Sequence, residues 1–126
     1  RPKAEATVSD AISCAIRRIS NVLPVAVLVN YSESGTSSLR AARERPTVPI
    51  LNLTPNLQAA RRLTVAWGVH SVVNDRLRQV DEVCSTALEI AQAQGMAQRG
   101  DTLLITAGVP FGQPGSTNSL RIETLI

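Results

Sequence analysis

Four short runs of apolar, β-branched residues recur along the chain, and segments with helical spacing separate them. The runs cover residues 25–29, 48–53, 69–73 and 102–106. The first two runs suit strands that are covered on both faces of a parallel sheet. Strands that alternate with helices indicate a mainly parallel sheet between two helical layers. We therefore predict an α/β fold with three layers, α/β/α.

A fifth strand is predicted near the C-terminal end, over residues 120–125. There Arg121 and Glu123 flank Ile122, which indicates an edge strand with one face partly exposed to water. The segment before it, residues 108–118, is rich in glycine and proline and has no helical pattern. A connection without a helix favours antiparallel pairing with the preceding strand. The predicted sheet thus has five strands, mostly parallel, with the last antiparallel.

Helical spacing first occurs over residues 12–23, where apolar side chains recur at three- and four-residue steps. Thr7 or Ser9 is the expected N-cap of this helix. Pro24 ends it, because a proline cannot continue a helix. A short helix is predicted over residues 37–44, after the first strand.

A further helix is predicted after the second strand, with Thr54 as N-cap and Pro55 at the first helical position. It is expected to end at Gly68. The longest helix is predicted after the third strand, where an apolar stripe begins at Val80 and Gly95 closes the helix.

The composition fits a single domain, residues 1–126, with 44% hydrophobic residues and a formal net charge of +3. Dispersed charge and scarce aromatic residues argue against a nucleic-acid partner, and no apolar run approaches the roughly 20 residues that span a membrane. Cys14 and Cys84 are predicted to lie buried on apolar helix faces, which favours a reducing, cytoplasmic compartment. His70 is interpreted as structural, and no residues have the spacing of a metal site.

Hydroxyl side chains and a glycine directly follow the first predicted strand: Ser32, Ser34, Gly35, Thr36 and Ser37. In such a sheet, ligands collect at the carboxyl ends of the strands, where a helix start offers unpaired N–H groups and the positive end of its dipole. The glycine lets the backbone approach a ligand, and the hydroxyls add donors. This combination is suited to a phosphate group. The alternative is a capping loop whose serines only satisfy their own backbone.

The glycine-rich segment after the fourth strand is expected to fold over the same edge of the sheet. Gly112, Gly115, Ser116 and Thr117 would give it mobility and further donors. The alternative is that Pro114 and Gly115 simply form a turn before the last strand. No catalytic constellation accompanies either segment, so we predict that this chain performs no chemistry by itself.

Several motifs occur in a fixed order over nearly the whole chain. They are Ser32-Glu-Ser-Gly-Thr-Ser37, Arg43-Glu-Arg-Pro46, residues 48–56, Ala60-Arg-Arg-Leu63, Trp67-Gly-Val69, residues 100–108 and Pro114-Gly-Ser-Thr-Asn118. Taken together, with matching spacing, this set resembles the C-terminal domain of pyruvate kinase, and it looks most like a bacterial member.

The resemblance implies that the full protein is a glycolytic transferase, which moves a phosphoryl group from phosphoenolpyruvate to ADP with magnesium and usually potassium. Its active site would lie in a preceding β/α barrel, next to a small lid domain. Neither is present in this chain, so the resemblance implies no catalytic residue, metal or cofactor on this domain. It further implies an allosteric effector pocket and one of the two kinds of interface in a homotetramer.

The family's effector-phosphate loop corresponds to the serine-rich segment. Ser34 and Gly35 match directly, and Ser32 keeps a hydroxyl where the family often has threonine. Thr36 stands where many members have arginine, so a cationic contact is missing. The family's mobile effector loop corresponds to residues 112–117.

One departure concerns the kind of effector. Members activated by fructose 1,6-bisphosphate hold its second phosphate with an arginine, and that position is Val83 here. Arg76 or Arg78 could substitute from the preceding turn. The resemblance therefore favours AMP or a sugar monophosphate over fructose 1,6-bisphosphate as effector.

The chain begins with Arg1, and residues 1–6 have the composition of a polar connector, which favours a domain cut from a longer protein. Two alternatives stay open. One is a free-standing phosphometabolite-binding protein of the same fold without a catalytic barrel. The other is an oligomerisation module whose pocket has lost its ligand, because a fold by itself does not establish a site.

Overall fold

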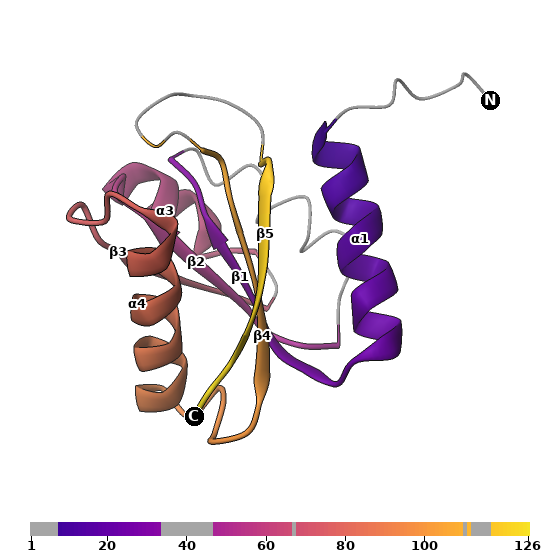
Figure 1. The fold of residues 1–126 in the computed structure, drawn as a ribbon. Coiled ribbons are helices and arrows are strands. Elements are labelled where there is room, and N and C mark those ends of the chain that lie inside the picture. Colours follow the sequence, from indigo (N-terminus) through magenta and orange to yellow (C-terminus); the bar gives the residue numbers. More distant parts are fainter. Residues whose placement is uncertain (1–7, 34–46, 67, 110, 112–116) are drawn as a thin grey trace.

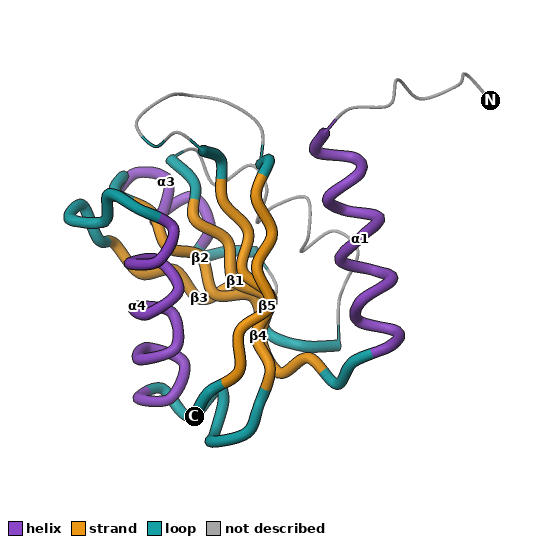
Figure 2. The backbone as a smooth tube through the Cα atoms, in the orientation of Figure 1, coloured by secondary structure: helices purple, strands orange, loops and turns teal. Residues whose placement is uncertain are grey.

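The described part of the chain folds into a mixed sheet with helices on both sides (Figure 1, Figure 2). The computed structural model describes residues 8–33, 47–66, 68–109, 111 and 117–126. In chain order the elements are α1 (Val8–Val22), β1 (Val25–Tyr31), β2 (Ile50–Thr54), α3 (Leu57–Leu63), β3 (Val69–Val73), α4 (Val80–Ala93), β4 (Thr102–Ala107) and β5 (Ser119–Thr124).

The described strands form one five-stranded sheet in the order β3-β2-β1-β4-β5. The first four are parallel, and β5 is antiparallel to β4. The predicted fold class, α/β with a mostly parallel sheet and an antiparallel last strand, is confirmed. β5 lies at an edge as predicted, and Ile122 on it is 48% exposed.

The larger core lies between the sheet and α4. Its buried side chains are Val27, Val29, Tyr31, Leu51, Leu53, Leu103, Ile105 and Ala107 from the strands and Val83, Cys84, Ala87 and Ala91 from α4. The strand positions alternate, so they share one face of the sheet, and the α4 positions recur at steps that share one side of a helix. Burial of each large side chain contributes about 1.5–3 kcal/mol. This layer therefore fixes α4 against the centre of the sheet.

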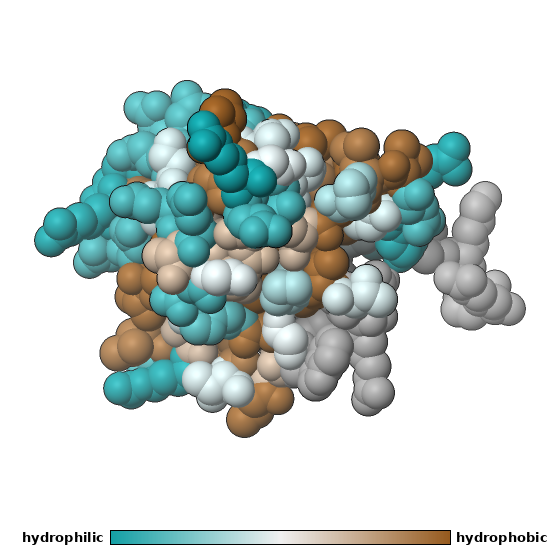
Figure 3. All heavy atoms as spheres, turned by 90° about the horizontal axis from the view of Figure 1, so that it is seen from below, coloured by the Kyte–Doolittle hydropathy of each residue, from teal (hydrophilic) through white to brown (hydrophobic). Residues whose placement is uncertain are grey.

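α3 and α1 contribute fewer buried side chains to the core than α4 does. α3 packs against β2 and β3 through its buried residues Ala59, Ala60 and Leu63. α1 lies on the side of the sheet away from α4 (Figure 1), and its isoleucines are only half-buried. In Figure 3 hydrophilic and hydrophobic residues are interspersed over the face shown, and scattered exposed apolar side chains of this kind are normal on a protein surface. Within the described residues, no helix has the length and hydropathy that crossing a membrane requires.

One predicted helix start is wrong. For α1 the predicted N-cap was Thr7 or Ser9; Ser9 lies inside the helix, and Thr7, like the predicted helix over residues 37–44, lies outside the described residues. Thr54 is the last residue of β2, because it pairs with Val73 of β3 in the sheet. The N-cap of α3 is Asn56, whose Oδ1 accepts hydrogen bonds from the N–H groups of Gln58 and Ala59 at 2.9 and 3.3 Å.

One of the two predicted helix-closing glycines is confirmed. Gly95 follows the C-cap of α4 with φ of 73°, the left-handed conformation that glycine adopts without strain, whereas α3 ends at Leu63 with Thr64 as its C-cap, so Gly68 does not close it. α1 has 15 residues and α4 has 14, so the prediction that α4 is the longest helix is wrong among the described elements.

Only one of the two predicted buried thiols is buried. Cys84 is 2% exposed and lies in the core under α4, as predicted. Cys14 is exposed, and the prediction for it is wrong. It lies two residues from both Ile12 and Ile16, and two residues turn a helix by about 200°, which moves Cys14 off the isoleucine side. The Arg17 guanidinium donates to Cys14 Sγ at 3.2 Å.

Candidate functional site

The central strand β1 marks the natural ligand position of this sheet. From β1 the chain continues outward to β2 and β3 on one side, whereas β4 lies on the other side. In an open parallel sheet, the crevice at the carboxyl ends of two strands whose connections leave in opposite directions is where ligands bind. Here those ends are Tyr31 of β1 and Ala107 of β4, which are register partners. The serine-rich segment starts at this position, and the Ser32 N–H donates to the Leu53 carbonyl at 3.1 Å.

An aromatic contact brings the two predicted site segments together. The rings of Tyr31 and Phe111 have centroids 4.6 Å apart and are tilted by 31°. Tyr31 is 5% exposed in the core, and Phe111 packs against the same core cluster. Tyr31 directly precedes Ser32, and Phe111 belongs to the glycine-rich segment. Tyr31 and Phe111 therefore bring the described ends of the two segments together, while most residues of both segments lie outside the described residues.

The base of the glycine-rich segment is closed by one side chain. The Val109 N–H donates to Asn118 Oδ1 at 2.8 Å, and Asn118 Nδ2 donates to the Val109 carbonyl at 2.8 Å. The Asn118 N–H also donates to the Ala107 carbonyl at 3.1 Å. These bonds hold the start of the segment beside its end, so that Phe111 emerges at a defined place above β4.

A third segment, the turn between β3 and α4, reaches the same region. Leu77 is 6% exposed and belongs to the core cluster that contains Tyr31. The next residue, Arg78, donates from Nη1 to the carbonyls of Asp75 and Leu77 at 2.8 and 3.1 Å. Glu82 Oε1 accepts from the N–H groups of Arg78 and Gln79 at 2.9 and 3.0 Å, which caps the start of α4. The turn is thus rigidly tied to the helix and to the core.

The pKa of the Tyr31 hydroxyl is shifted by burial and by nearby charges. Burial raises the pKa of Tyr31 above its usual value, and the nearby Glu33 carboxylate raises it further. The Arg78 guanidinium lowers this pKa, so a positive charge from the third segment acts at the carboxyl end of β1.

Only two of the predicted site residues, Ser32 and Thr117, lie within the part of the chain that the structure describes. Ser32 is half-buried at the end of β1, and Thr117 is 7% exposed beside the clamp residue Asn118. The other predicted members lie outside the described residues: Ser34, Gly35, Thr36, Ser37, Gly112, Gly115 and Ser116. Tyr31, Phe111 and Asn118 were not predicted as site residues from the sequence. The chain has only one tyrosine and one phenylalanine, and both follow predicted strands, which was a usable signal for the pair.

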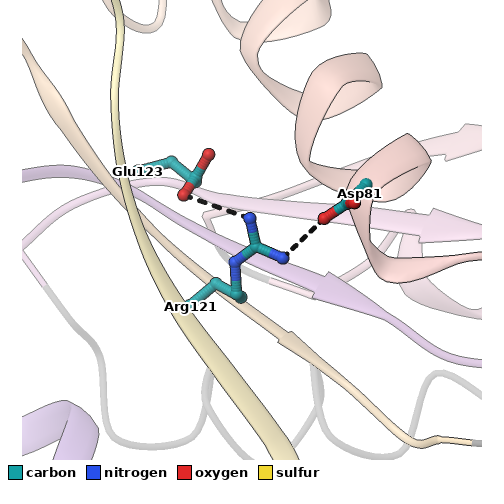
Figure 4. Close-up of polar contacts among 3 residues, drawn as sticks. All are labelled: Asp81, Arg121 and Glu123. Atoms are coloured by element: carbon teal, nitrogen blue, oxygen red, sulfur yellow. Dashed lines mark hydrogen bonds and ion pairs between the residues drawn. The ribbon is translucent and has the colours of Figure 1, made fainter.

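Two features away from this edge are structural. Arg121 of β5 donates from Nη1 to Asp81 Oδ1 of α4 at 2.8 Å, and its Nη2 lies 3.5 Å from Glu123 Oε2 (Figure 4). The hydrogen bond with Asp81 raises the pKa of Arg121 above its usual value. This ion pair ties the edge strand to the first turn of α4. Metal binding has no support in the part of the chain that the structure describes, where no three His, Cys, Asp or Glu residues gather.

Comparison with known proteins agrees with this architecture. The family model described as the pyruvate kinase alpha/beta domain matches residues 10–123. The chain belongs to the pyruvate kinase family. It is 43% identical over 122 residues to a pyruvate kinase of Methylorubrum extorquens, which covers 97% of this chain and 26% of that protein. It is 39% identical over 129 residues to a pyruvate kinase of Agrobacterium vitis, which covers 97% of this chain and 27% of that protein.

Solved pyruvate kinases have the same fold. The structure of Cryptosporidium parvum pyruvate kinase in complex with ADP matches 100% of this chain and 25% of that chain, with a TM-score of 0.86 and 26% sequence identity. The family and fold predicted from the sequence are therefore confirmed. The chain spans about a quarter of the length of the pyruvate kinases that it matches.

Within the pyruvate kinase family, the departure at Val83 has a structural counterpart. Val83 is 0% exposed and lies in the core between α4 and the sheet. The apolar Val83 side chain offers no hydrogen-bond donor to a phosphate.

Proposed function

We propose that this chain is the regulatory and oligomerisation domain of a pyruvate kinase and that it binds a phosphorylated effector at the carboxyl ends of β1 and β4. The full enzyme would transfer a phosphoryl group from phosphoenolpyruvate to ADP in the cytoplasm, with magnesium and potassium bound outside this domain. The catalytic residues would lie in an upstream barrel, so the chain is inactive alone.

The contact between Tyr31 and Phe111 carries this proposal. It joins the start of the serine-rich segment to the glycine-rich segment at the point where this sheet topology binds ligands. Hydroxyls and backbone N–H groups at such an edge are donors that match the acceptor oxygens of a phosphate. The family membership supports the same reading, since it assigns the chain to the alpha/beta domain of pyruvate kinase.

A monophosphate such as AMP or a sugar monophosphate is the favoured effector. The position that would hold a second phosphate in a bisphosphate carries Val83, which is buried in the core. The alternative function is a free-standing phosphometabolite-binding protein, and it differs only in lacking a barrel to regulate.

The first experiment is a thermal-shift measurement on the 126-residue chain. The ligands are AMP, ribose 5-phosphate, glucose 6-phosphate, fructose 1,6-bisphosphate and inorganic phosphate. A ligand at about 100 times its dissociation constant stabilises the native state by about 2.7 kcal/mol, which is a measurable shift. We expect a shift with a monophosphate that is lost in the double variant Ser34→Ala, Thr36→Ala and kept in the control Ser85→Ala, whose side chain is exposed on α4.

A tighter response to the bisphosphate than to any monophosphate would contradict the favoured effector. No shift with any ligand would contradict effector binding by this domain. In the full-length enzyme, the double variant is expected to abolish activation and to leave basal turnover intact, because an effector acts only through its differential affinity for two states. Loss of tetramers in that variant, measured by sedimentation, would instead assign the serine-rich segment to assembly.

A further inference from the structure

We draw no further inference here: the strongest candidate, the apolar face of α1 on which Ile12, Ile16 and Ile19 are only half-buried, carries nothing, because no contact in the part of the chain that the structure describes shows what covers it.

Discussion

Removing the amide of Asn118 tests how the glycine-rich segment is held. In Asn118→Ala both hydrogen bonds to Val109 disappear, each 2.8 Å long. A hydrogen bond contributes about 0.5–1.5 kcal/mol net, and the exposed position of Asn118 favours the lower half of that range. We expect a loss of about 1–2 kcal/mol in the free energy of unfolding. The variant stays folded, since domains of this size are stable by about 5–15 kcal/mol.

Asn118→Asp separates the two bonds. The carboxylate still accepts from the Val109 N–H, but it faces the Val109 carbonyl without a donor. Protonation restores the donor, so the pKa of the new Asp is raised in the folded state, and its stabilising contribution is present below the ordinary pKa of about 3.9 and is lost as pH rises. Relative to Asn118→Ala, Asn118→Asp should therefore gain stability from about pH 7 to about pH 4.

The assay is urea denaturation of the unaltered chain and the variants at both pH values, with the midpoint and slope fitted separately. Asn21→Ala is the control, because Asn21 is also exposed and lies in α1, away from this segment. If Asn118→Ala lies within about 0.3 kcal/mol of the unaltered chain, or if Asn118→Asp shows no pH dependence of its own, the clamp does not contribute to stability.

Three further predictions concern local packing, an ionisable thiol and a helix cap. Phe111→Ala should lower the free energy of unfolding by about 1–2 kcal/mol in urea and weaken phosphate binding, because the contact with Tyr31 is lost; unchanged phosphate affinity would contradict the role of this contact. Burial is the main cause that raises the pKa of the Cys84 thiol, so the unfolded state ionises first. Stability should therefore fall as pH rises above about 8.5, by up to about 1.4 kcal/mol per pH unit, and Cys84→Ala should flatten that dependence. Asn56→Ala should cost about 1 kcal/mol in thermal unfolding and Asn56→Ser should cost less, because serine still caps; equal losses would refute the cap.

The order of strands and helices was predictable because each local pattern agreed with the fold. Short runs rich in apolar residues became β1 to β4, and the connection without a helix became the antiparallel pair of β4 and β5. Boundaries were less predictable, since tertiary pairing overrides local preference. Thr54 has the chemistry of an N-cap, but pairing with Val73 keeps it in the sheet and moves the cap to Asn56.

The sequence predicted the edge of the sheet for the candidate site but not the contacts found there. Serines after one strand and glycines after another indicate the carboxyl edge, where Tyr31 and Phe111 are in contact. The pairing of Tyr31 with Phe111 joins residues that are far apart in the sequence, and no local pattern encodes which loop crosses over which strand. The bonds between Asn118 and Val109 likewise depend on how β4 and β5 are aligned.

The buried position of Val83 narrows the kind of effector further. Val83 lies on the stripe of α4 that faces the core, together with Cys84 and Ala87. An arginine there would lose packing and bury an unpaired charge, at a cost of about 3–5 kcal/mol or more. A second phosphate would therefore have to be held from the turn before α4. On that turn Arg78 is oriented by two carbonyls, whereas the Arg76 guanidinium has no orienting bond among the described residues. Because Val83 itself offers no donor to a second phosphate, a monophosphate remains the effector that we propose.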